Sequence, residues 1–72
     1  MTPEQFDALA QLMRLSPDTP RGRALRSVLC DGVPVAAAAR AEAIAHPAVS
    51  RAVARAQKTL SLAAECVRGS IL

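Results

Sequence analysis

Three basic side chains, Arg51, Arg55 and Lys58, recur at helical spacing in the second half of the chain. No acidic residue lies between positions 47 and 62 to neutralise them. A guanidinium group can donate hydrogen bonds to the O6 and N7 atoms of guanine, and an ammonium group can neutralise a phosphate. The pattern therefore favours binding to double-stranded DNA, although an ordinary solvated helix face would carry the same residues.

The distribution of charge along the chain is uneven. Residues 1–20 carry one basic and three acidic side chains, whereas residues 21–72 carry eight basic and three acidic ones. Arg21, Arg23 and Arg26 fall at the start of an expected helix, where the helix dipole disfavours cations. Local helix stability does not explain these arginines, so a phosphate-backbone role is one interpretation. A surface that merely keeps the protein soluble is the other.

Other chemistries find little support in the residue types. The chain has one histidine and two cysteines, and it has neither a Ser-His-Asp set nor a glycine-rich phosphate loop. These features argue against an enzyme, a cofactor, a metal site or a small-molecule substrate. Cys30 and Cys66 are interpreted as small apolar residues of helix packing faces. The longest uncharged apolar run, 33–39, is far shorter than the roughly 20 residues of a membrane span. Without a signal-peptide pattern at its start, the chain is expected to be cytoplasmic and away from membranes.

Residues typical of helix starts and ends recur along the chain, and no alternating pattern typical of a strand occurs. Thr2 is expected to cap a helix from Pro3 to about Leu15, with Gln5 completing a capping box. The apolar stripe expected on this helix consists of Phe6, Leu9, Leu12 and Met13.

Thr19 and Pro20 repeat the same start signal for a second helix, which should end at Asp31 before Gly32. Gly22 is expected to be a mild weakness in its first turn. A third helix is expected over 35–41. The fourth should run from 47 to 68, because a residue that precedes proline, here His46, is biased out of the helical region.

The third and fourth helices together suggest a known DNA-binding arrangement. One side of the fourth helix is apolar, and the three basic residues fall on the opposite side. A short helix, a turn and a longer helix form a helix-turn-helix, in which the second helix enters the major groove. The sequence therefore predicts an all-α, small helix-turn-helix domain over residues 1–58. Base contacts are assigned to Ser50, Arg51 and Arg55, and phosphate contacts to Arg40, His46 and Lys58.

The size and composition of the chain favour a homodimer. Among 72 residues, 16 are alanine and Phe6 is the one aromatic, so the core of a single chain is expected to be weak. The long helix should extend beyond the domain as a C-terminal dimerisation helix over 59–72, and leave its apolar residues exposed in a monomer. The residues assigned to dimerisation are Leu60, Ala63, Val67 and Ile71, which continue a three-and-four spacing that starts at Val53 and Ala56.

Three segments also resemble the TrfB/KorA plasmid repressors. Residues 28–32, Val-Leu-Cys-Asp-Gly, are similar to the stretch that leads into the first helix of that family's helix-turn-helix. Residues 48–55, Ala-Val-Ser-Arg-Ala-Val-Ala-Arg, resemble its recognition helix, and the opening 2–6 is similar too. The resemblance implies a dimeric transcriptional repressor that occupies operators of plasmid or transfer genes.

The turn between the two helices departs from that family's pattern. Glu42 and Ala43 stand where the family has a core leucine and a tight-turn glycine, and Ala45 stands where it has a Ser or Thr cap. A buried Glu42 carboxylate would be costly unless the turn directs it outward. The target sequence therefore does not transfer from the family. These departures also favour the alternative function, a degenerate helix-turn-helix that binds a protein partner through its apolar stripe.

Overall fold

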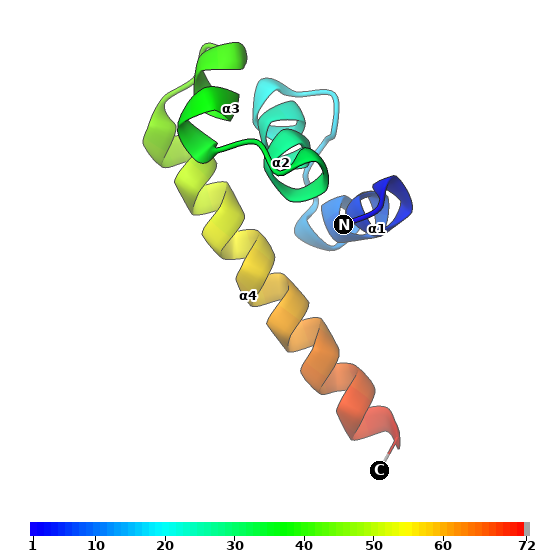
Figure 1. Ribbon diagram of the computed structural model, residues 1–72. Helices are drawn as coiled ribbons and strands as arrows, with labels where there is room; N and C mark the ends of the chain where they lie inside the picture. The colour runs from blue at the N-terminus through cyan, green and yellow to red at the C-terminus, as the bar shows by residue number, and fades with distance from the viewer. Residues whose placement is uncertain (72) are drawn as a thin grey trace.

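Helices account for the regular structure of the chain. The computed structural model describes residues 1–71 and the side chains of residues 1–69. Its elements are α1 (Pro3–Met13), α2 (Pro20–Asp31), α3 (Val35–Ala41) and α4 (His46–Ile71). No strand occurs within 1–71, which confirms the all-α expectation. In Figure 1, α1, α2 and α3 gather around the first half of α4, and the second half of α4 projects away from them. The described chain measures 45 × 20 × 20 Å.

The helix starts follow from residues close to them in sequence. The Thr2 hydroxyl accepts a hydrogen bond from the Gln5 backbone N–H at 3.1 Å, and the Gln5 side chain accepts one from the Thr2 N–H at 3.0 Å. The Thr19 hydroxyl likewise accepts from the Gly22 N–H at 3.1 Å. Both predicted caps are confirmed, because each satisfies N–H groups that lack a partner within the helix.

Helix α1 differs from the prediction in its end and in its buried face. It stops at Met13, two residues before Leu15, because Arg14 adopts a left-handed conformation (φ 53°). Leu12 is 63% exposed, and Ala10 takes its place on the buried stripe. Positions 6, 9, 10 and 13 repeat at i, i+3, i+4 and i+7 and so share one helix face, whereas position 12 lies well to the side of it.

The core consists of two clusters that share α4. In the first, α1 and α2 cover α4 through Phe6, Leu9, Ala10, Met13, Leu25, Ala52 and Ala56. In the second, α2 and α3 meet α4 through Ala24, Ala38, Ala39 and Val49. Val53 is half-buried between the two clusters. The first half of α4 is therefore held by all three preceding helices, with alanines that let the helix backbones approach closely.

Gly22 is a packing requirement rather than the predicted weakness. It is buried, and a Cβ atom at this position would lie 2.2 Å from the Ser16 carbonyl oxygen and 2.9 Å from the Pro17 Cα. The first turn of α2 can lie against the preceding loop only because position 22 has no side chain.

Helix α4 begins one residue earlier than expected and continues farther. His46 is its first residue, and Pro47 fits in the first turn, where a backbone N–H would have no intrahelical acceptor. The helix passes position 58 and then position 68 without a break and ends at Ile71. Among the described residues, none of the helices combines enough length and hydrophobicity to cross a bilayer.

Candidate nucleic-acid interface

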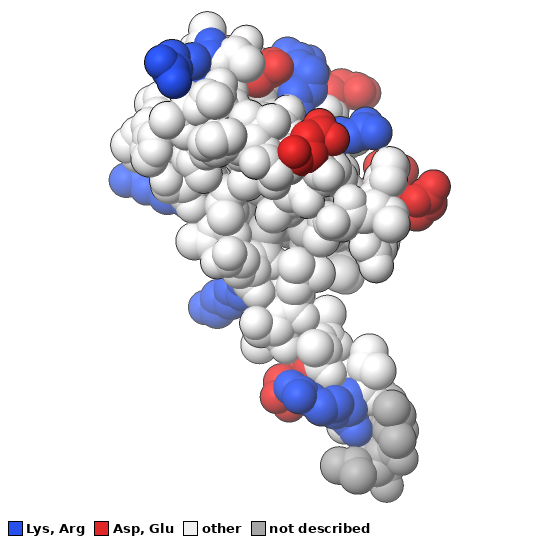
Figure 2. All heavy atoms as spheres, viewed as in Figure 1, with Lys and Arg blue, Asp and Glu red and all other residues white. Residues whose placement is uncertain are grey.

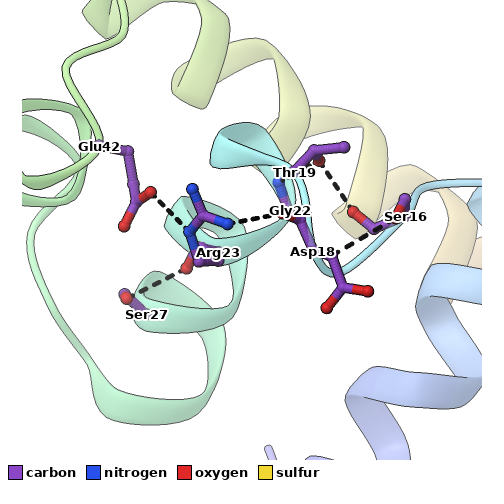
Figure 3. A network of polar contacts seen from close by, with 7 residues as sticks. All are labelled: Ser16, Asp18, Thr19, Gly22, Arg23, Ser27 and Glu42. Carbon is purple, nitrogen blue, oxygen red and sulfur yellow. Dashed lines mark hydrogen bonds and ion pairs between the residues drawn. The ribbon is translucent and has the colours of Figure 1, made fainter.

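The turn that leads into α4 is fastened to α2 by Arg23. Its Nε donates to the Glu42 carboxylate at 2.7 Å, and one of its terminal nitrogens donates to the Asp18 carbonyl oxygen at 2.6 Å (Figure 3). The Glu42 side chain is 22% exposed. The carboxylate that departs from the family pattern is therefore half-buried and compensated by a charge. Arg23 joins the loop before α2 to the turn after α3, which explains its presence at a helix start.

Ala43 occupies a position that usually requires glycine. Its φ is +55°, in the left-handed region that residues with a Cβ atom rarely adopt. The turn nevertheless closes α3, since the N–H of Ala43 donates to Arg40 O at 3.2 Å and that of Ile44 donates to Ala39 O at 3.0 Å. With alanine at this position, the hydrogen bonds of a normal helix end are in place.

The first turn of α4 begins without a side-chain cap from Ala45, which carries only a methyl group. The Ala48 N–H instead donates to the Ala45 carbonyl oxygen at 3.0 Å. The Ser50 hydroxyl lies 3.5 Å from Nδ1 of His46, one turn earlier. His46 is exposed and Ser50 is half-buried, so the residues predicted to contact phosphate and base lie next to each other.

The basic residues of α4 have different surroundings. Arg51, Arg55 and Lys58 are all exposed, but a terminal nitrogen of Arg55 donates to the Met13 carbonyl oxygen at 3.0 Å. Arg55 thus supplies a cation to the C-terminal end of α1, whose own last turn has no basic residue. In the part of the chain that the structure describes, the ion pairs are Arg23 with Glu42 and Arg68 with Glu65. Arg51, Arg55 and Lys58 therefore keep their charges uncompensated by carboxylates.

The two signs of charge are unevenly placed on the visible face. In Figure 2, basic side chains lie along the left edge of the molecule, and the opposite side of the helical cluster carries most of the acidic side chains together with further basic ones. Arg40 is exposed in the last turn of α3. It comes from a different helix than the other predicted contacts.

Arg21 is the residue whose placement the sequence did not indicate. It lines a hollow of about 270 Å³ together with Arg51 and Arg55, between the start of α2 and the start of α4. The only sequence signal was a cation in the first turn of a helix, where the dipole does not favour it. That signal also holds for Arg23, which pairs with Glu42 instead.

The projecting half of α4 exposes apolar residues as predicted. Leu60, Leu62 and Val67 are 40%, 58% and 60% exposed, and Ala63 is half-buried. Val53 and Ala56, which begin the same spacing, pack in the core of their own chain. The side chain of Ile71, the fourth residue assigned to dimerisation, lies outside the described residues.

The two cysteines also differ in their surroundings. Cys30 is half-buried and packs against the first core cluster, as predicted. Cys66 is exposed on the projecting half of α4, so the prediction that it lies in a packing face is not met within a single chain. No cluster of three or more potential metal ligands occurs among the described residues.

Comparison with known proteins adds no relative. No protein-family model, curated protein or solved structure matches this chain. The structure itself defines the class: a small all-α domain of four helices with a long, projecting C-terminal helix.

Proposed function

We propose that this protein is a dimeric transcriptional regulator that binds operator DNA with the first half of α4. The observation that carries the proposal is the division of this half-helix into two faces. Val49, Ala52 and Ala56 are buried against the other helices. Arg51 and Lys58 are exposed on the opposite side without carboxylate partners. A helix supported in this way can enter the major groove with its basic side chains directed at base edges and phosphates.

The support behind α4 is consistent with this use. Helix α3 packs on α4 through Ala38 and Ala39 and is linked to it by a turn whose shape the Arg23–Glu42 ion pair holds. Base-edge contacts require a rigidly positioned helix, because a bidentate arginine contact depends on its geometry. The resemblance to the TrfB/KorA repressors supports repression by operator occupancy as the mode of regulation.

A homodimer would be formed by the projecting half of α4. Leu60, Ala63 and Val67 continue a seam whose earlier members are already buried in the core, so a second copy can cover them. In an antiparallel pair centred between Leu60 and Val67, the dyad lies about 10 residues, or roughly 16 Å, from the midpoint of Arg51 and Arg55. Two recognition segments would then stand roughly 32 Å apart, which is close to one turn of B-DNA.

Fluorescence anisotropy with DNA from upstream of the protein's own operon tests the DNA-binding proposal. If a dimer neutralises roughly six to eight phosphates, log affinity should fall with log salt at a slope of about −5 to −7. Arg51→Ala should weaken the preferred site by about 1–3 kcal/mol and reduce its margin over random DNA. Lys58→Ala should weaken all sequences alike.

Arg68→Ala serves as the matched control, because Arg68 is paired with Glu65 on the projecting half of α4. This substitution should leave the affinity for DNA unchanged. A slope near zero, or no duplex binding at low salt, would contradict the proposal. It would leave the alternative function, docking of a protein partner on the exposed apolar residues of α4, as the one to pursue.

Analytical ultracentrifugation tests the dimer. Replacing Leu60 and Val67 together by Asp should give monomers that no longer bind DNA. Replacing Ser61 and Leu62 together by Asp adds the same charge on the other side of the same helix segment, and should leave the dimer intact. If both double variants had the same oligomeric state, the dimer interface would lie elsewhere on the molecule.

A further inference from the structure

The hollow beside α4 combines an apolar lining with three cationic side chains. Met13 and Leu15 line it from the end of α1 and the following loop, and Ala48 and Ala52 line it from α4. Arg21, Arg51 and Arg55 also line it. An apolar concavity with a few convergent polar groups is the usual composition of a small-molecule site. Its volume of about 270 Å³ lies just below the range of about 300–1,000 Å³ that is usual for such sites, and suits a ligand with a single ring.

The positive charge of the hollow has no counterpart in the protein. Among the described residues, none of the three arginines forms an ion pair with a carboxylate. Arg55 is held in place by its hydrogen bond to the Met13 carbonyl oxygen. Like charges placed together repel one another, and an anion bound among them removes that repulsion.

We propose that the hollow binds a small organic anion, with an apolar ring or chain against Met13, Leu15 and Ala52 and a phosphate or carboxylate among the three arginines. The apolar lining selects for this ligand over inorganic phosphate or a backbone phosphate of DNA, which have no apolar part to bury. Guanidinium groups suit the anionic end, because they can donate two parallel hydrogen bonds to a phosphate or a carboxylate.

The site overlaps with the surface proposed to bind DNA, and this consequence rests on the proposed function. Arg51 and Arg55 cannot contact base edges while they hold a ligand anion. The bound ligand would therefore compete with DNA and release the regulator from its operator.

Titrations followed by ¹H–¹⁵N NMR, without DNA, test the site itself. The probes are phenyl phosphate, inorganic phosphate and benzyl alcohol, all at constant ionic strength. Phenyl phosphate should shift the amide signals of Leu15, Ala48 and Ala52, and should bind at least about fivefold more tightly than either other probe. Equal binding of phenyl phosphate and inorganic phosphate would reveal a bare anion site and overturn the proposal, as would shifts confined to other parts of the protein.

Two variants with the same net charge separate the hollow from general electrostatics. Arg21→Gln should weaken phenyl phosphate binding about fivefold or more. Arg26→Gln removes an exposed arginine of the same helix that does not line the hollow, and should leave binding unchanged. Equal losses in both variants would show that only the overall charge attracts the ligand, and would overturn the proposal.

A competition measurement then links the hollow to DNA. Saturating phenyl phosphate should lower DNA affinity beyond the effect of inorganic phosphate at the same ionic strength, and Arg21→Gln should reduce this difference. If phenyl phosphate binds but the protein does not bind DNA at all, the ligand site stands and the proposed function fails. If DNA and phenyl phosphate bind without competing, the overlap of the two sites is refuted.

Discussion

Replacing Gly22 with alanine should destabilise the protein, although alanine is the better helix former by about 1 kcal/mol. The new Cβ would lie 2.2 Å from the Ser16 carbonyl oxygen and 2.9 Å from the Pro17 Cα. Both are backbone atoms, so no side-chain rotation can relieve the contact. The loop before α2 would have to move away from the first turn of α2 by about 1 Å to restore a normal van der Waals distance.

That movement also disturbs the cap of α2. The Thr19 hydroxyl donates to the Ser16 carbonyl oxygen at 2.8 Å and accepts from the Gly22 N–H at 3.1 Å (Figure 3), so it joins the two segments that must separate. Overpacking costs about 1–3 kcal/mol and a weakened cap about 1 kcal/mol. After the gain in helix propensity, a net loss of about 2 kcal/mol remains. In a chain of this size, this corresponds to a fall in melting temperature of roughly 8–16 °C.

Urea denaturation followed by far-ultraviolet circular dichroism, at fixed protein concentration, measures this loss. Gly69→Ala is the matched control, because it makes the same substitution in a helix where a Cβ would meet nothing within 4 Å. It should be neutral or stabilising by up to about 1 kcal/mol. The close approach of α2 to the preceding loop would be refuted if Gly22→Ala were as stable as the unmodified protein.

Three further substitutions test contacts around α4 by the same denaturation assay. Ala43→Gly should stabilise the protein by about 0.5–1 kcal/mol, since it relieves a left-handed φ of +55°, and a loss of stability would contradict that conformation. Arg55→Met should lower the free energy of unfolding by about 1 kcal/mol even without DNA, because the Met13 carbonyl oxygen loses its donor. Arg51→Met should leave the stability unchanged, and equal losses in the two variants would argue against the contact. Glu42→Gln should lower the free energy of unfolding by less than about 1 kcal/mol, and this loss should shrink at 1 M salt because its partner Arg23 is largely exposed. A loss that salt does not change would show that the ion pair is not what Glu42 contributes to stability.

The local features of this fold could be predicted from the sequence because each depends on residues within about one helical turn. The caps at Thr2 and Thr19 each satisfy an N–H group three residues ahead, and Gly32 ends α2 by adopting a positive φ of 68°. The opposition of buried Val49 to exposed Arg51 follows from helical periodicity alone. The exposure of Leu60 and Val67 has a different source, because α4 is longer than the segment that α1, α2 and α3 cover.

Contacts between segments far apart in the chain were decided by how the helices cross. In the sequence, Arg21 and Arg23 could not be told apart, and Arg55 was assigned to a base contact. In the structure, Arg23 pairs with Glu42, Arg55 binds the end of α1, and Arg21 lines a hollow together with Arg51. The sequence predicted Gly22 to be a weak point of its helix, whereas the structure requires glycine there because the loop at Ser16 packs against it. The sequence by itself thus determined which helices form and which faces are apolar, since those properties are local. Only the tertiary structure decided what each polar side chain contacts, because that depends on where separate helices bring their backbones together.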